Sequence, residues 1–300
     1  MTQLIGDILA VPGAPMALDA GFAAGLLALD WPQAAQGDAV AAQGAVERYR
    51  IERGVAVVPV RGLLTPNSAT LERWLGWATY RGIEESCAAL AADDSVAAVV
   101  LEFDTPGGMV LGIEDAAQAV AALAALKPVY ALAAPLAASA GYWLASQARE
   151  ISMTPGASVG SIGVAVTTWR AVQPGGDGSQ EFEFTSPHAR AKWPDPTTET
   201  GRAEIIRGLA ETEARFHAAV AAGRKIALAD LPTALSVSDD PADGGAVFAA
   251  HEAQARKLAD RIETRAEFYT RVLAAHAPAP RHSSRAALAR ARAAEATARS

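Results

Sequence analysis

The sequence contains a single cysteine, Cys87, among its 300 residues. An internal disulfide and a zinc or iron–sulfur site built from cysteines are therefore excluded, and a reducing compartment is expected. Aromatic residues make up only 6% of the chain and charged residues 20%, whereas hydrophobic residues make up 51%. This balance is typical of a packed globular chain, because a disordered chain has lower hydrophobicity and more charge.

Basic residues are also in short supply. The 26 Lys and Arg residues against 33 Asp and Glu residues give a net charge of −7, which argues against a general nucleic-acid-binding protein. The best apolar run, residues 20–29, is about half the length of a membrane-spanning helix. The first 13 residues hold no Lys or Arg, so no secretory signal peptide is predicted. We therefore expect neither export nor a transmembrane segment.

Short β-branched runs alternate with segments of helical spacing over much of the chain. The clearest runs, VAVVPV at 55–60, VAAVVLEF at 96–103 and PVYALA at 128–133, predict buried strands. Further strands are expected at 151–153 and 161–166. The predicted helices and loops are a weak helix at 17–29, helices at 80–92, 113–126, 202–224 and 247–273, a short helix ending at Ser146, and a loop at 231–245. This alternation predicts an α/β fold with right-handed crossovers.

The chain divides into three parts by composition. Residues 1–50 are rich in alanine and glycine and are interpreted as an N-terminal extension. Residues 51–273 contain the strand and helix patterns and are predicted to form one domain. Residues 274–300 are rich in Ala and Arg, with five Arg against one Glu after residue 276, and form a basic tail.

The sequence offers no pattern for a metal or a nucleotide. None of the five histidines forms a His-x-x-x-His pair, and no Walker A or GxGxxG motif occurs. We therefore expect no metal and no cofactor. His217 and His251 fall in helical segments and are interpreted as surface or interface residues. Cys87 lies in the middle of a predicted helix and is interpreted as a small buried side chain.

Ser139 is the most promising nucleophile. It follows a predicted strand, lies among small residues in AASAG and begins an apolar helix. Small neighbours let a substrate backbone approach closely, although an ordinary helix N-cap serine is the alternative interpretation. The DTPGG turn at 104–108 also follows a strand, so both segments are expected at the carboxyl edge of the sheet. The N–H groups of Gly108 and Ala140 are then candidates for an oxyanion hole around Ser139.

A catalytic serine needs a base, and no histidine lies in a segment that obviously reaches Ser139. Among the four lysines, Lys127 precedes its strand, and Lys225 and Lys257 belong to late charged helical segments. Lys192 is the remaining candidate, in the loop ARAKWPDP. It must lose its proton near neutral pH, so its pKa must fall from about 10.4 by desolvation. An ion pair with Asp195 would instead raise that pKa.

Six elements occur in an order and spacing that resemble the signal peptide peptidase A (protease IV) family of serine peptidases. Within it the chain is most similar to the phage head-maturation, or capsid-assembly, proteases. The resemblance covers residues 54–265. Its elements are VAVVPVRGLLTP, DTPGG, KPVYALAAPLAASAGYWLAS, PGASVGSIGV, the lysine loop followed by GRAEIIRGLAETEARFHAAVAAGR, and GGAVFAAHEAQARKLADRI. Two features depart from the family pattern: Thr105 replaces the commoner serine, and the loop before Lys192 lacks a glycine-rich lead.

This resemblance implies a ClpP/crotonase-like α/β fold with repeated β-β-α units and a helical C-terminal region. It implies a Ser–Lys dyad with Ser139 as nucleophile and Lys192 as general base. It assigns the amides of Gly107 and Gly108 to the oxyanion hole, beside the Ala140 N–H proposed above, and Ser161 to a position that orients the lysine. It further implies no cofactor, a homo-oligomer, and polypeptide substrates such as capsid proteins, scaffold proteins or the chain itself.

Because no membrane anchor is predicted, the phage or prophage branch is favoured, with a location in the host cytoplasm or in the prohead. A bacterial cytoplasmic protease similar to signal peptide peptidase is an alternative within the same family. Two other classes remain open: a crotonase-type acyl-CoA enzyme, and a catalytically inert capsid-assembly or scaffolding subunit. Peptide cleavage that depends on Ser139 would exclude both of these.

Overall fold

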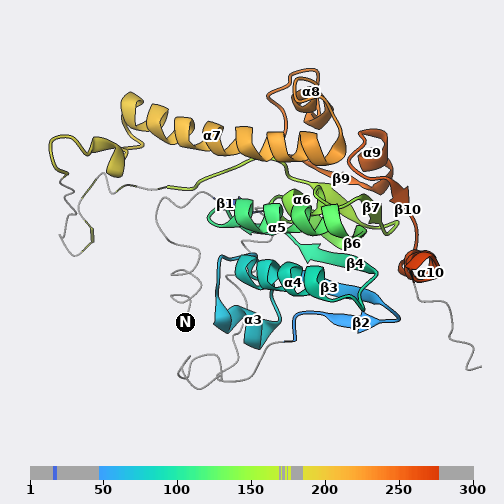
Figure 1. Ribbon diagram of the computed structural model, residues 1–300. Helices are drawn as coiled ribbons and strands as arrows, with labels where there is room; N and C mark the ends of the chain where they lie inside the picture. The colour runs from blue at the N-terminus through green and yellow to red at the C-terminus, as the bar shows by residue number, and fades with distance from the viewer. Residues whose placement is uncertain are drawn as a thin grey trace, which may run out of the picture.

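The computed structural model describes residues 16–18, 47–168, 170, 173, 175–176 and 185–276. These residues form a mixed α/β structure around an eight-stranded, mostly parallel sheet, followed by a helical C-terminal region (Figure 1). The predicted α/β class is therefore confirmed. Most of the N-terminal extension and the tail beyond His276 lie outside the described residues.

The sheet has the strand order β10-β7-β6-β4-β3-β2. Strands β3, β4, β6, β7 and β10 are parallel, and β2 pairs antiparallel with β3 at one edge. β8 pairs in parallel with the end of β6 and antiparallel with β9. The bounds are β2 Arg50–Glu52, β3 Val55–Arg61, β4 Ala98–Thr105, β6 Val129–Ala138, β7 Glu150–Met153, β8 Ser158–Gly160, β9 Val247–Ala249 and β10 Arg261–Ile262.

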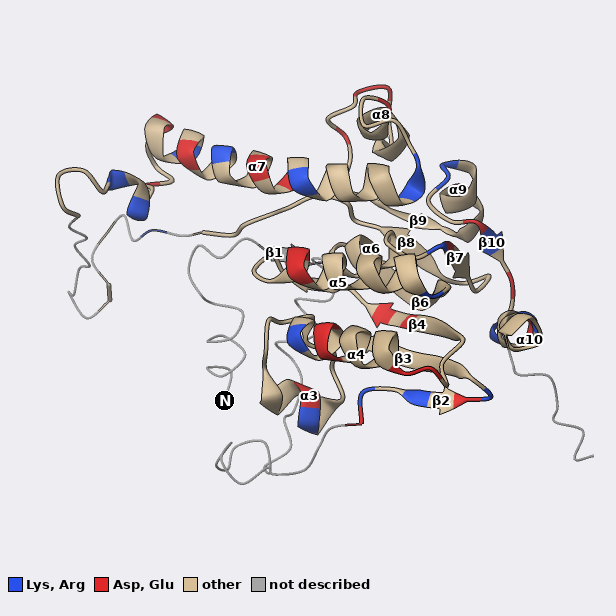
Figure 2. Cartoon of the chain, viewed as in Figure 1, with Lys and Arg blue, Asp and Glu red and all other residues tan. Residues whose placement is uncertain are grey.

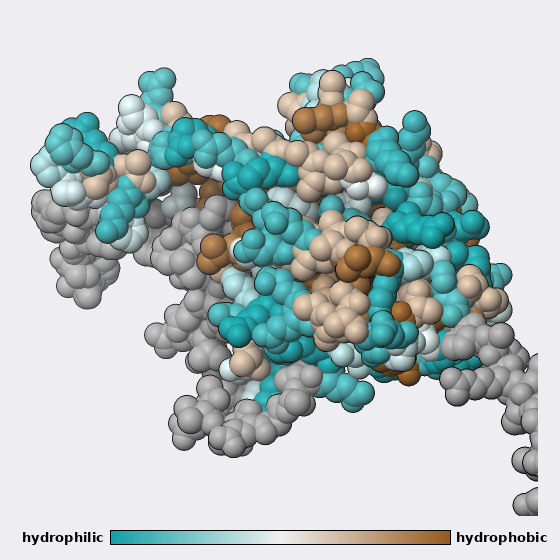
Figure 3. Space-filling model, in the orientation of Figure 1, coloured by the Kyte–Doolittle hydropathy of each residue, from teal (hydrophilic) through white to brown (hydrophobic). Residues whose placement is uncertain are grey.

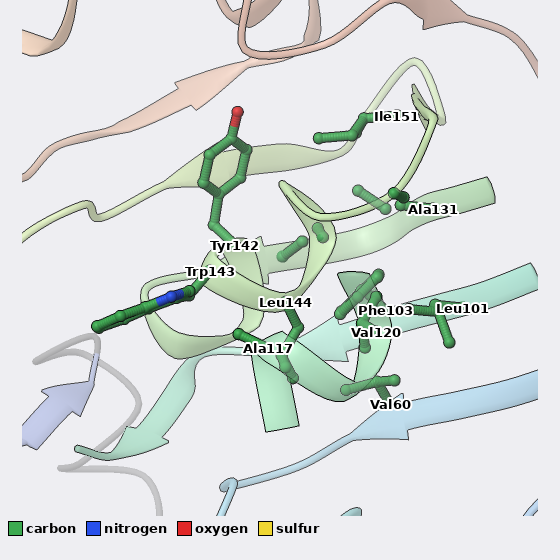
Figure 4. Packing of buried hydrophobic residues seen from close by; sticks show 14 of the residues in the cluster. Val60, Leu101, Phe103, Ala117, Val120, Ala131, Tyr142, Trp143, Leu144 and Ile151 are labelled. Carbon is green, nitrogen blue, oxygen red and sulfur yellow. The ribbon is translucent and has the colours of Figure 1, made fainter. Parts of the chain in front are cut away.

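Helices cover both faces of this sheet because its strands are apolar on both sides. On β3, Ala56, Val58 and Val60 face a large core that α4, α5, α6 and α7 complete (Figure 4). Val55 and Val57 face a smaller core that α10 completes. The helices are α3 Ala69–Leu75, α4 Tyr80–Ala92, α5 Ile113–Leu126, α6 Ala140–Ala145, α7 Glu199–Arg224, α8 Leu231–Leu235, α9 Ala250–Ala255 and α10 Arg265–His276, with the 3-10 turn η2 at Arg190–Lys192.

A short strand, β5 (Gly107–Met109), stands between β4 and α5 and makes a β-β-α unit of the predicted kind. One side of β5 bridges in parallel to Leu64, and the other side pairs antiparallel with β1 (Met16–Leu18). β5 is thus held between two segments that are distant in sequence.

The strand and helix predictions hold best in the central region, where the helices at 80–92 and 113–126 have the predicted bounds. The strand predicted at 161–166 is wrong: β8 ends at Gly160, because Ser161 has a φ of 52° and its N–H donates to the Ala246 carbonyl. The helix predicted at 17–29 lies outside the described residues except at β1, which is a strand.

The C-terminal predictions need two further corrections. Residues 231–245 contain the short helix α8, so this segment is not entirely loop. Residues 247–273 do not form one helix but β9, α9, β10 and most of α10. The chain leaves α9 at Lys257, whose φ is 62°, and the pairing of β9 with β8 and of β10 with β7 outweighs the local helical pattern.

The surface is mostly hydrophilic on the face shown in Figure 3, with separate apolar patches. The most exposed large apolar side chains are Leu111, Leu126 and Ile206. Within the described part of the chain, no helix has both the length and the hydropathy required to cross a bilayer.

The position of α7 over α6 depends on one aromatic contact. Trp143 and Phe216 are buried and stack with ring centroids 4.4 Å apart and an interplanar angle of 8°. One polar contact follows further along: Gln147, just after the end of α6, donates from its Nε2 to the Ala219 carbonyl of α7 at 3.4 Å. These contacts set the register of the two helices.

We expect Phe216→Ala to lower the free energy of unfolding by about 3–5 kcal/mol, because it leaves a cavity under Trp143. Urea denaturation followed by far-UV circular dichroism and tryptophan fluorescence measures this loss. Ile206→Ala is the matched control on the exposed face of the same helix, where a change within about 0.5 kcal/mol is expected. Equal losses in the two variants would contradict the proposed importance of the stack.

Candidate active site

Ser139 stands at the junction between β6 and α6, in a backbone conformation that a serine seldom adopts. Its φ is 54° and its ψ is −121°. Its N–H donates to the Gly160 carbonyl at 2.7 Å, and its carbonyl accepts from the Trp143 N–H at 2.9 Å. A non-glycine residue in such a conformation costs on the order of 1–3 kcal/mol, so the surrounding structure must hold it there.

The side chain of Ser139 is buried but has no hydrogen-bond partner. The residue is 1% exposed, and its Oγ bonds to no group among the described residues. Buried hydroxyls are usually paired, so an unpaired one calls for a functional explanation. Ser139 also lacks a cap hydrogen bond to α6, which excludes the ordinary N-cap interpretation.

The Ser139 side chain lines a pocket of about 600 Å³. Its walls come from the segment after β8, from α7 and from α8 with the loop that follows it. The lining residues are Ser139, Ser161, Ile162, Gly163, Val164, Ala165, Glu213, His217, Pro232, Leu235, Pro241, Ala242, Gly244 and Gly245. We call this the Ser139 pocket.

The two glycine-containing segments meet as the sequence predicts. A Cβ on Gly141 would collide with Cγ2 of Thr105, so α6 approaches the end of β4 more closely than any larger residue permits. Thr105 Oγ1 also accepts from the Gly107 N–H at 3.1 Å and donates to the Gly62 carbonyl at 2.6 Å. The strand that carries the glycines is therefore fixed directly beside α6.

The three candidate oxyanion donors differ in their surroundings. The Gly107 N–H is already bonded to Thr105. The Met109 N–H and the Gly107 carbonyl both bond to Leu64, so by the alternation of a strand the N–H of Gly108 points to the opposite edge, where β1 pairs. Ala140 is the first residue of α6, so its N–H has no acceptor within the helix. Ala140 is thus the best placed of the three to donate to a ligand, whereas Gly108 faces Ala17 of β1 and donates to a ligand only where β1 leaves this edge.

The structure brings Ser161 to Ser139 but does not bring Lys192 there. Ser161 directly follows Gly160, to which Ser139 is bonded, and it lines the same pocket. Lys192 is exposed on η2, beyond the end of α7 that lies away from α6 (Figures 1 and 2). It is not among the residues that line the Ser139 pocket.

Residues on either side of Lys192 line a separate pocket of about 470 Å³, and Arg190, Trp193 and Asp195 are among them. Asp195 forms an ion pair with Arg170 at 3.3 Å. Hydrogen bonds from Thr197 and the charge of Arg170 lower the pKa of the Asp195 carboxyl. The described contacts therefore assign Asp195 to Arg170 and to its own turn rather than to Lys192.

Sequence reasoning missed two residues of the Ser139 pocket, Glu213 and His217. His217 was expected at the surface or an interface, but it is half-buried and faces the pocket. Burial lowers the pKa of its imidazole, and the nearby Glu213 charge opposes this only in part, so the ring is neutral at pH 7. Their spacing of four residues places both on one face of α7, but only the stack on Trp143 shows which face meets the pocket.

Cys87 is part of the main core, as predicted. It is 4% exposed, and burial raises the pKa of its thiol to about 12, so it is not a nucleophile at neutral pH. Within the residues that the structure describes, no group of three or more His, Cys, Asp or Glu side chains is arranged to hold a metal ion.

Comparison with known proteins identifies relatives of part of this chain. The model of peptidase family S49 matches residues 121–277. Capsid assembly protease C of Escherichia phage lambda is 41% identical over 116 residues, which are 39% of this chain and 26% of that protein. Head-tail preconnector protein GP5 of Enterobacteria phage P21 is 36% identical over 119 residues, which are 40% of this chain and 24% of that protein. Protease 4 of Haemophilus influenzae is 32% identical over 120 residues, 40% of this chain and 19% of that protein.

The chain thus spans about a quarter or less of the length of these curated relatives. Among solved structures, an enoyl-CoA hydratase/isomerase family member matches with a TM-score of 0.39 and 20% identity, over 75% of this chain and 73% of that one.

The backbone at Ser139 leads to a stability prediction. We expect Ser139→Gly to be about 1 kcal/mol more stable than Ser139→Ala, because glycine adopts a positive φ without a steric penalty. Chemical denaturation of the two variants measures the difference, and both lack the hydroxyl. An alanine variant as stable as the glycine variant would show that the junction relaxes to an ordinary conformation.

Proposed function

This chain belongs to peptidase family S49, and from that premise we propose that it is a serine endopeptidase with Ser139 as its nucleophile. The observation that carries the proposal is the Ser139 Oγ, which is buried, has no hydrogen-bond partner among the described residues and lines a pocket. Its place on a strained strand-to-helix junction supports the same role, since strain of this kind clusters at active sites.

The proposed reaction proceeds by acyl transfer. A general base removes the Ser139 proton, and the oxygen attacks the carbonyl carbon of a peptide bond. The Ala140 N–H stabilises the negative oxygen that develops. The Gly108 N–H joins it when a substrate replaces β1 at the edge of β5, and the Gly107 N–H joins it where its bond to Thr105 opens. The base then protonates the departing amine, and water hydrolyses the acyl-enzyme. No cofactor enters this scheme.

We propose Lys192 as the base and a second copy of the chain as its source. α7 rises by about 1.5 Å per residue, so Glu199 at its start lies about 21 Å along the axis from Glu213 in the Ser139 pocket. Lys192 precedes this start and lies farther out (Figure 1). The stack of Phe216 on Trp143 fixes the other half of α7, so a lysine from another copy reaches Ser139 without bending the helix. Ser161, beside Ser139, is then placed to orient it.

We further propose that the substrates are capsid or scaffold polypeptides of a phage or prophage, cleaved within the prohead or the host cell. The proteins named capsid assembly protease and head-tail preconnector are the relatives that support this proposal. The pairing of β5 with the extended segment β1 also supports a polypeptide ligand, since an extended peptide binds such an edge by adding a strand.

We expect Ser139→Ala to lower kcat/KM for cleavage of an unfolded protein by at least about 10³-fold, because no other group supplies the nucleophile. Lys192→Ala is expected to cause a comparable loss. Intact-mass spectrometry over time measures cleavage, with Arg190→Ala in the same turn as the control that retains activity. Full activity in Lys192→Ala together with loss of activity in His217→Ala would make His217 the base. If neither the wild type nor any variant cleaves the unfolded protein or capsid proteins, an inert assembly subunit is favoured.

The origin of the lysine is tested by mixing variants. Ser139→Ala and Lys192→Ala chains are each expected to be inactive, but co-expression should restore up to about a quarter of the wild-type activity in a two-copy arrangement, because one site then holds both residues. Mixing Ser139→Ala with the double variant provides the control. No restoration would contradict a lysine supplied by another copy.

A further inference from the structure

We propose that Glu213 selects peptide substrates with a cationic side chain, Arg or Lys, within a few residues of the scissile bond. This inference rests on the proposed peptidase function and names the substrate class for the same pocket. It adds to that function a residue on α7, an element that carries none of the proposed chemistry.

The helix register places Glu213 at the level of Ser139. Trp143 stacks on Phe216, and Gln147, just after the end of α6, contacts Ala219 on α7. Ser139 lies one helical turn before Trp143, and Glu213 lies about one turn before Phe216 on α7. Glu213 and Ser139 are therefore at the same level. The Glu213 Oε1 also lies 3.6 Å from where a Cβ on Gly163 would stand, which places the carboxylate at the pocket wall.

Glu213 has the charge to bind a cation, and no cation among the described residues of its own chain is paired with it. Among the described residues that line the Ser139 pocket, none is Lys or Arg. Within the described chain Glu213 has no ion pair, whereas Glu204 and Glu211 on the same helix both pair with Arg207. The His217 imidazole beside it is neutral at pH 7, because burial lowers its pKa, so it does not cancel the charge.

The rest of the pocket suits the same kind of side chain. The loop 236–245 after α8 carries three exposed aspartates and no basic residue, which makes the local potential more negative. Ile162, Val164 and Leu235 provide apolar wall against which the methylene stem of Arg or Lys packs while its charged end reaches Glu213. A volume of about 600 Å³ is ample for such a side chain.

The test uses sets of alanine-rich peptides. Within a set the peptides differ at one position, which is Arg, Gln or Glu, and each set varies a different position flanking the cleavage site. For the wild-type protein we expect the best Arg peptide to be cleaved with a kcat/KM about 2–5-fold above its Gln counterpart, and the Glu peptide to be the poorest, as one exposed and partly screened ion pair provides. Glu213→Gln should remove the Arg preference, and Glu213→Arg should reverse it in favour of Glu. Glu211→Gln, which lies on the same helix outside the pocket, should keep the wild-type preference.

A binding measurement tests the charge preference without catalysis. Fluorescence anisotropy with the Ser139→Ala protein should give a tighter Kd for the labelled Arg peptide than for the Glu peptide, and Glu213→Gln in that background should remove the difference. A natural basic probe is available in the chain itself, as a peptide of residues 281–300.

The outcomes separate the two levels of the proposal. Cleavage that depends on Ser139 but is equal for Arg, Gln and Glu peptides overturns the role of Glu213 and leaves the peptidase function intact. An Arg preference that survives Glu213→Gln also overturns it. The absence of cleavage of every peptide, together with equal Kd values for the Arg and Glu peptides, overturns both.

Discussion

The candidate site depends on the pairing of β8 with the last three residues of β6. Between Phe103 and Asp104 of β4, the register with β6 shifts past Ala134 and Pro135, and beyond this irregularity β6 exchanges β7 for β8 as its neighbour. The Gly160 carbonyl at the end of β8 then holds the N–H of Ser139. The chain must leave β6 sharply at this residue, so the positive φ of Ser139 follows from the sheet rather than from local preference.

The same constraint explains which parts of the site were predictable. Buried strands and the helices at 80–92 and 113–126 were predictable because their apolar periodicity agrees with their burial. The meeting of DTPGG with the small residues around Ser139 was predictable for a similar reason, since both segments follow parallel strands. These are rules about single elements and their ends, and a single sequence contains enough information to apply them.

The predictions that failed concern contacts between distant segments. Residues 161–166 alternate like a strand, yet the Ser161 N–H bonds to the carbonyl of Ala246, 85 residues further along the chain. The pattern of residues 247–273 predicts one helix, but β9 pairs with β8 and β10 pairs with β7, so the segment is divided into shorter elements. Glu213 and His217 share a helix face in the sequence, but nothing local indicates that this face covers Ser139. The position of Lys192 depends likewise on the direction of α7, which the Trp143–Phe216 stack sets.

The site therefore combines two structural parts with different origins. The proposed nucleophile and the candidate oxyanion donors belong to the sheet and α6, which contribute residues to the main core. The wall that carries Glu213 and His217 belongs to α7, which reaches this edge through a few contacts, chiefly the stack on α6. A change at the stack would move this wall relative to Ser139 while the strained junction stays in place. The proposed substrate preference and the geometry of Ser139 thus depend on separate contacts, and the exposed positions of α7 are able to vary without disturbing the backbone that holds Ser139.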